Sequence, residues 1–167
     1  DWGRYALPEK GMLFSEASLR YSDVNNHVLG KWGETLVQLY TYSATPTVPG
    51  SYFLVGQLTV PKEYEGIIVK HKKVQGVKIP SGYQKYQMEW EEFNECYEVF
   101  ATEIDKVTSF ELLNPKFMAY LKDNELEFSL EVISDTIYFF THVAQCDEKN
   151  YEILLNVLNG AYKELKL

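Results

Sequence analysis

Hydrophobic and polar positions alternate along the first half of this chain in the way that is typical of β-strands. We expect strands over residues 27–32 and 35–43, with side chains pointing alternately to the two faces of a sheet. Gly33-Glu34 between them predicts a tight hairpin turn, because glycine adopts the left-handed backbone that such a turn needs. Asparagine and aspartate at positions 23–26 predict a further turn just before the first strand.

The most apolar stretch of this half is residues 52–60, which predicts a central strand. Proline has no N–H to donate to a sheet, so Pro61 should end that strand. Another strand is expected over 67–74, after Gly66. A short strand at 86–90 and one helical turn should then lead into a strand at 98–101.

The chain from Thr102 onward contains two signals for helix starts. Thr102 followed by Asp105 has the spacing of a capping box, and Ile104 and Val107 would form a narrow apolar stripe on that helix. Asn114-Pro115 is the clearer signal, because asparagine caps a helix and proline fits its first position. Apolar side chains on one face of this second helix should face the core, namely Phe117, Met118 and Leu121.

A hairpin and a terminal helix complete the pattern. Residues 126–132 alternate between apolar and polar, which predicts a strand with one wet face. Ser134-Asp135 should turn it, and the return strand at 136–143 is apolar on both faces. Asp147 should cap a last helix, in which Gly160 costs about 1 kcal/mol relative to alanine. Its expected buried stripe consists of Tyr151, Leu154, Leu155, Leu158, Tyr162 and Leu165.

These elements define the fold class as α+β. We expect one domain over residues 1–167, with an irregular leading segment at 1–18. The sheet should be mostly antiparallel with about six to eight strands, with short helices and the C-terminal amphipathic helix packed on it. A chain of this length and a hydrophobic content of 46% suit one folded domain.

Charge is divided unevenly along the chain, whose formal net charge is −8. Residues 1–87 hold ten Lys and Arg against seven Asp and Glu, a net +3, whereas residues 88–167 hold six against seventeen, a net −11. The acidic half argues against nucleic-acid binding, since it would repel phosphates. The basic run of Lys70, Lys72, Lys73 and nearby Lys78 is a candidate contact with an anionic membrane surface. The alternative is a solvated strand face, or an edge strand that lysines protect from pairing.

Known catalytic and cofactor-binding motifs are absent from the sequence. There is no nucleophile elbow and no phosphate-binding loop, and the three histidines have no metal-ligand spacing. Glu91, Glu92 and Glu95 could put two carboxylates on one helical face for a hard cation, but runs of this kind are normally solvated surface. We therefore assign no catalytic, cofactor-binding or metal-binding residue and expect no cofactor.

The two cysteines, Cys96 and Cys146, are too few for a disulfide scaffold and favour free thiols in a reducing compartment. One bridge between them stays open as an alternative. A cysteine nucleophile beside a histidine is disfavoured, because glutamates around Cys96 would raise its pKa.

Three segments together resemble a bacterial family catalogued as domain of unknown function 3137. Phe93 to Thr102 resembles that family's F-x-x-x-F-x-V-x-S segment, with Ala101 in place of the usual serine. Leu113 to Met118 is similar to its Leu-Thr-Pro-x-Phe-Met step, with Asn114 in place of threonine. Gly30 to Leu39 is similar to its Gly-x-x-Gly-x-x-x-V/I-x-φ hairpin, where φ is apolar. The resemblance would cover about residues 20–165.

The resemblance implies a domain cut from a longer, membrane-anchored protein, since family members often carry hydrophobic segments before it. A start at Asp1 agrees with that, and the soluble domain would then be cytoplasmic. No activity comes with the family. The first hypothesis is a non-enzymatic binding or interaction module of a membrane-associated protein, with a protein or an anionic membrane surface as partner. The alternatives are a hydrolase-type enzyme whose site is assembled from distant residues, and a small-molecule sensor. The oligomeric state stays open.

Overall fold

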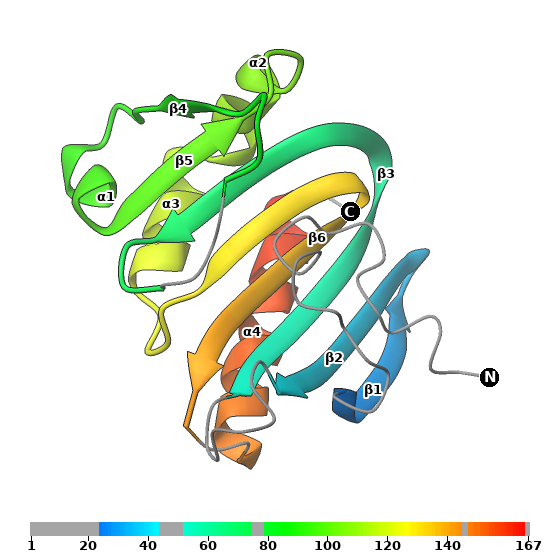
Figure 1. The fold of residues 1–167 in the computed structure, drawn as a ribbon. Helices are drawn as coiled ribbons and strands as arrows, with labels where there is room; N and C mark the ends of the chain where they lie inside the picture. Colours follow the sequence, from blue (N-terminus) through cyan, green and yellow to red (C-terminus); the bar gives the residue numbers. More distant parts are fainter. Residues whose placement is uncertain (1–23, 44–51, 75–78, 145–146, 166–167) are drawn as a thin grey trace.

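The computed structural model describes residues 24–43, 52–74, 79–144 and 147–165, and these form an α+β fold as predicted (Figure 1). The strands are β1 (Val24–Trp32), β2 (Thr35–Ser43), β3 (Tyr52–His71), β4 (Gln84–Tyr86), β5 (Tyr97–Ala101) and β6 (Ser129–Val143). The helices are α1 (Glu91–Cys96), α2 (Lys106–Leu112), α3 (Pro115–Lys122) and α4 (Glu148–Glu164).

All strand pairs are antiparallel, and β3 is the centre of the sheet. The strand order is β1-β2-β3-β5-β4, and β6 pairs with β3 along both of its arms. The first arm of β3 lies between β2 and β6, so that Gly56 is opposite both Leu39 and Phe139. The second arm lies between β5 and β6, with Val69 opposite Val99 and Leu130. Figure 1 shows β3 as a wide arch with the two arms of β6 lying inside it.

One long strand therefore replaces the two strands that we expected on either side of Pro61. The pairing of β3 with β6 shifts register between Thr59 and Tyr64 and again between Tyr64 and Ile67. Pro61 lies within that irregular stretch and has no partner in the ladder. Its missing N–H therefore costs no ladder hydrogen bond, and the chain bends where we expected it to stop.

The helices cover one face of the sheet, and the main apolar core lies between the helices and that face. Gly56 in β3 marks the closest approach of α4, because a Cβ built there would lie 2.8 Å from Leu154 Cδ1 and from Leu158 Cδ1. Buried residues of this core come from every layer, among them Leu54, Leu58, Phe93, Phe117, Phe128, Phe139, Leu154 and Leu158. Burial of these side chains is the main favourable contribution to folding.

The predicted stripe of α4 needs two corrections. Leu155 is 43% exposed, while Val157 and Ala161 are fully buried and belong to the core. The helix is thus rotated toward Val157, which a pattern of large residues alone did not indicate. Gly160 is also more than a weak point, since the Tyr120 ring of α3 packs against it at a distance that leaves no room for a Cβ. The glycine thereby lets α3 and α4 approach each other.

The opposite face of the sheet holds a smaller aromatic cluster. Val37 and Leu39 of β2 belong to the helix-covered core, whereas Tyr40 and Tyr42 belong to this second cluster, as the alternation predicted. Tyr40 is 1% exposed and donates to Gln57 Oε1 at 3.3 Å. Burial raises the pKa of Tyr40 above its ordinary value, with Tyr138 adding to the effect.

Local turn and cap chemistry accounts for most element boundaries. Gly33 has φ +59° in the predicted hairpin turn. The hairpin expected at Ser134-Asp135 was wrong, because residues 129–143 form the single strand β6, which bends at Ser134 with φ +54° and pairs with β3 on both sides of that bend. Asn114 Oδ1 accepts from the Phe117 N–H at 3.0 Å, and Asp147 Oδ1 accepts from the Asn150 N–H at 2.9 Å. Two of the three predicted helix caps, those at Asn114 and Asp147, are thus confirmed.

Three further expectations about strands were wrong. β1 begins at Val24, so the asparagines expected in a turn lie in the strand, where Asn26 has φ +53° beside a register shift. β4 spans Gln84–Tyr86 and shares only Tyr86 with the strand that we expected at 86–90. The predicted wet face of β6 is buried, since Ser129 and Glu131 are both 0% exposed. Alternation alone does not show that a second layer covers the polar side of a strand.

Candidate functional site

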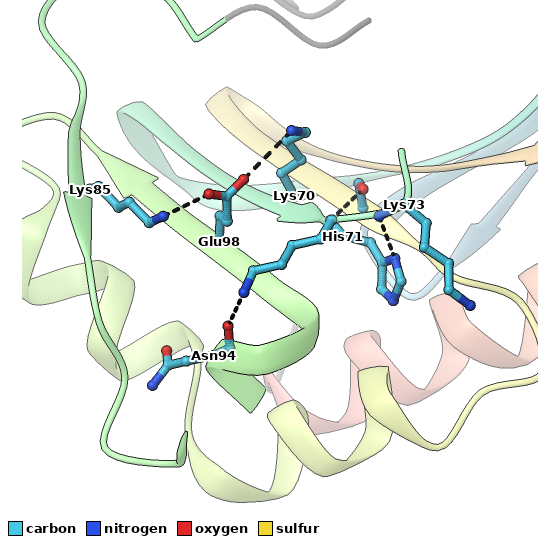
Figure 2. A network of polar contacts seen from close by, with 8 residues as sticks. Lys70, His71, Lys73, Lys85, Asn94 and Glu98 are labelled. Carbon is cyan, nitrogen blue, oxygen red and sulfur yellow. Dashed lines mark hydrogen bonds and ion pairs between the residues drawn. The ribbon is translucent and has the colours of Figure 1, made fainter. Parts of the chain in front are cut away.

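The predicted basic run lies at the end of β3, where acceptors of this chain already engage its lysines (Figure 2). Lys70 Nζ lies 3.6 Å from Glu98 Oε2, and Lys85 Nζ lies 2.6 Å from Glu98 Oε1. Lys72 Nζ donates to the Asn94 carbonyl at 2.7 Å, and Lys73 pairs with Glu127. Lys78 lies outside the described residues. The acidic half of the chain thus neutralises much of this basic run.

The charge pairs around the run also shift the pKa values of the paired groups. The hydrogen bond from Lys85, and then the positive charges of Lys85 and Lys70, hold the pKa of Glu98 below its ordinary value. The hydrogen bond to Glu127 raises the pKa of Lys73. Lys70 does not lie on an edge strand, because the second arm of β3 pairs with β5 on one side and β6 on the other. Lys72 and Lys73 follow the end of β3 at His71.

His71 lies in the middle of this run but is buried, with 7% of its surface exposed. Its Nδ1 accepts from the Lys73 N–H at 3.3 Å, and its ring meets Tyr97 edge-on at 4.8 Å between centroids. The backbone N–H of His71 donates to Ser129 Oγ at 2.9 Å. Burial lowers the pKa of His71, an effect that Glu127 opposes and Lys73 reinforces. The neutral imidazole is thus the form that fits this position.

This arrangement predicts a pH-dependent stability. Unfolded histidine titrates at about 6.5, so the unfolded chain takes up the His71 proton first as the pH falls, and the free energy of unfolding decreases. We expect urea unfolding at pH 7.0 and 5.5 to show this decrease in the native sequence and a smaller one in His71→Leu. Equal decreases in the two proteins would contradict the prediction, and His142→Leu, at an exposed position, is the control.

Asp105 has a different role from the capping-box partner that the sequence predicted. It is 3% exposed, and its Oδ2 accepts from the backbone N–H groups of Glu65 at 2.6 Å and Gly66 at 2.8 Å. The Thr102 N–H donates to the Gly66 carbonyl at 3.1 Å, while the Thr102 hydroxyl is buried without a partner among the described residues. Asp105 therefore fastens the β3 arch to the start of α2 instead of capping that helix.

The start of α2 also presents large apolar side chains to solvent. Ile104 is 70% exposed, Val107 is 68% exposed and Phe110 is 41% exposed. We call these three residues the α2 stripe: Val107 and Phe110 lie on α2 at three-residue spacing, and Ile104 lies two residues before the helix begins at Lys106. The opposite side of α2 is buried through Ser109 and Leu112. A seven-residue helix thus has two apolar faces, and the core covers only one of them.

Beside the stripe lies an open hollow of about 460 Å³, which we call the apolar groove. Its walls come from α2, α3 and the segment before α1, and Phe110 belongs both to it and to the α2 stripe. The lining residues are Met88, Glu89, Trp90, Phe110, Leu113, Pro115 and Met118. Phe110 thus links the stripe to the groove.

A second hollow, of about 260 Å³, lies between the β3 arch, α2 and the end of α4. Lys62, at its edge, already donates to Thr108 Oγ1 at 3.3 Å and lies 5.3 Å from the Tyr64 ring centroid. Neither hollow is lined by His142 or by the buried Glu131. Among the described residues, no three His, Cys, Asp or Glu side chains are grouped so that they could hold a metal ion.

Two further features are the state of the cysteines and the presence of membrane-spanning helices. Cys96 is a free, half-buried thiol, and Cys146 lies outside the described residues. In the described part of the chain, no helix is both long enough and apolar enough to cross a bilayer.

Comparisons with known proteins define the fold of this chain. No family model matches it, and no curated protein matches it in sequence. A solved structure, the crystal structure of the mycobacterial trehalose monomycolate transport factor A (TtfA), is similar to it with a TM-score of 0.66. The alignment covers 98% of this chain and 83% of that chain at 9% sequence identity. At such low identity the likeness shows a shared fold.

Proposed function

We propose that this domain is a non-enzymatic interaction module of a membrane-associated protein, and that the α2 stripe is part of the surface that binds a protein partner. The exposure of Ile104, Val107 and Phe110 is the observation on which the proposal rests. Contiguous apolar surface is costly to leave in water and is typical of interaction sites. The similar fold belongs to a protein named as a transport factor, which agrees with a role without catalysis.

The anionic-membrane hypothesis receives less support. Lys70, Lys72 and Lys73 already have acceptors on this chain, and a lipid phosphate would have to displace them. A small-molecule sensor is the second candidate, because the apolar groove has a volume within the range of about 300–1,000 Å³ that is common for ligand sites.

Site-specific photo-crosslinking tests the proposal. A benzophenone amino acid replaces Val107 in the full-length protein, in the cells that produce it, and Glu152 on α4 is the control position because it is also exposed. We expect one protein adduct from position 107, none from position 152, and loss of the adduct when Ile104→Asp is added. Crosslinking to lipid alone, or an adduct that Ile104→Asp leaves unchanged, would refute the proposal.

A further inference from the structure

We propose that the α2 stripe and the apolar groove together bind a basic amphipathic helix of the partner protein. The inference rests on the proposed function and specifies the chemistry of the partner. The surface offers an apolar strip through Val107 and Phe110 that continues into a groove lined by Met88, Trp90 and Met118. An apolar helix face, with anchors at i, i+3, i+4 and i+7, is the complement of such a strip.

The construction of the groove favours a helix over an extended segment. Residues of α2, α3 and 88–90 form its walls, no described strand contributes to its lining, and the Met88 N–H and C=O already bond the Asn94 side chain. An extended peptide lying there would bury its own backbone N–H and C=O groups without partners. A helix bonds its backbone internally, so that it presents only side chains to the groove.

The charges around the surface select a basic partner. Glu89 lines the groove, Glu91 follows Trp90, and Glu103 and Glu111 flank the two ends of the α2 stripe in sequence. All four side chains belong to exposed residues, and none of these carboxylates has an ion-pair partner among the described residues. Lysine or arginine residues beside an apolar helix face would pair with them.

Lysines near the same surface are mostly neutralised. Lys122, whose Nζ lies 5.0 Å from the Trp90 ring centroid, pairs with Glu92 at 2.9 Å, and Lys116 pairs with Glu164. Lys106 is the exception: it lies 5.4 Å from the Tyr86 ring centroid and has no carboxylate partner in the described part of the chain. Four unpaired carboxylates, of which Glu89 lines the groove and Glu111 lines the second hollow, against one unpaired ammonium leave the surroundings of stripe and groove, which we call the rim, negative. An anionic bilayer would be repelled by that rim.

Fluorescence anisotropy with two synthetic 18-residue helices tests the inference. Both peptides carry leucines at i, i+3, i+4 and i+7; one has lysines beside that face and the other has glutamates. We expect the purified 167-residue chain to bind the lysine peptide at least tenfold more tightly at 50 mM NaCl, with the preference shrinking at 500 mM. Phe110→Asp should weaken binding at least tenfold, and combined Glu103→Lys and Glu111→Lys should reduce the preference for lysine.

Leu155→Asp is the matched control, because Leu155 on α4 is 43% exposed, close to the 41% of Phe110, yet lies outside stripe and groove. It should leave binding unchanged. Equal binding of both peptides, equal losses in the two variants, or Phe110-dependent flotation with phosphatidylglycerol vesicles would overturn the inference. A Val107 crosslink to a protein, together with failure of both peptides, would refute the basic helix while leaving the proposed function standing.

Discussion

Replacing Asp105 by alanine is expected to lower the free energy of unfolding by about 3 kcal/mol. The carboxylate is buried and accepts from two backbone N–H groups, those of Glu65 and Gly66. Hydrogen bonds to charged groups contribute about 1.5–3 kcal/mol each, and alanine would leave both donors without that acceptor. Urea unfolding followed by circular dichroism measures the change. The loss should exceed that of a typical surface substitution several-fold.

Two variants separate this role from the capping box that the sequence predicted. Asp105→Asn keeps an oxygen acceptor without the charge, so we expect a loss of about 1 kcal/mol. Thr102→Val replaces a buried hydroxyl that has no partner among the described residues, so it should not destabilise the protein. If Thr102 were the helix cap, the same change would cost about 1 kcal/mol. If Thr102→Val lowered the free energy of unfolding and Asp105→Ala did not, Thr102 would be the helix cap, and the role of Asp105 seen in the structure would be contradicted.

Replacing Gly56 by valine should destabilise the domain by about 2–3 kcal/mol, although valine suits a strand better than glycine does. The reason is the close packing of α4: a Cβ at this position would lie 2.8 Å from Leu154 Cδ1 and Leu158 Cδ1. Either α4 moves away from the sheet or its leucines leave their preferred rotamers. Thermal and urea unfolding of the purified variant measure the loss.

Gly30 in β1 provides the matched control, since a Cβ there would meet nothing within 4 Å. Gly30→Val should be neutral or slightly stabilising. Combining Leu154→Ala with Gly56→Val should cost less than the sum of the two single substitutions, because the alanine vacates part of the space that the valine needs. Strictly additive effects of the two substitutions would show that the closeness of α4 is not the cause.

The candidate site was only partly predictable from the sequence. The spacing of Ile104 and Val107 indicated an apolar stripe on a short helix; the structure begins that helix at Lys106, so only Val107 lies on it, and both side chains are exposed. Their exposure was not predictable, because α2 also carries Leu112 on its other side and the pattern does not say which face meets the core. The basic run was evident as well, but its partners Glu98 and Glu127 are distant in sequence.

Local chemistry in the sequence determined the α+β class, the Gly33 turn, and the caps at Asn114 and Asp147, because each depends on a few neighbouring residues. The tertiary structure alone decided that β3 continues through Pro61 as one arch, that Asp105 fastens that arch, and that the α2 stripe stays uncovered. Each of these depends on segments separated by tens of residues along the chain. Hydrogen-bond partners and covering layers at such separations leave no periodic signal in the sequence, since periodicity records only which way a side chain points.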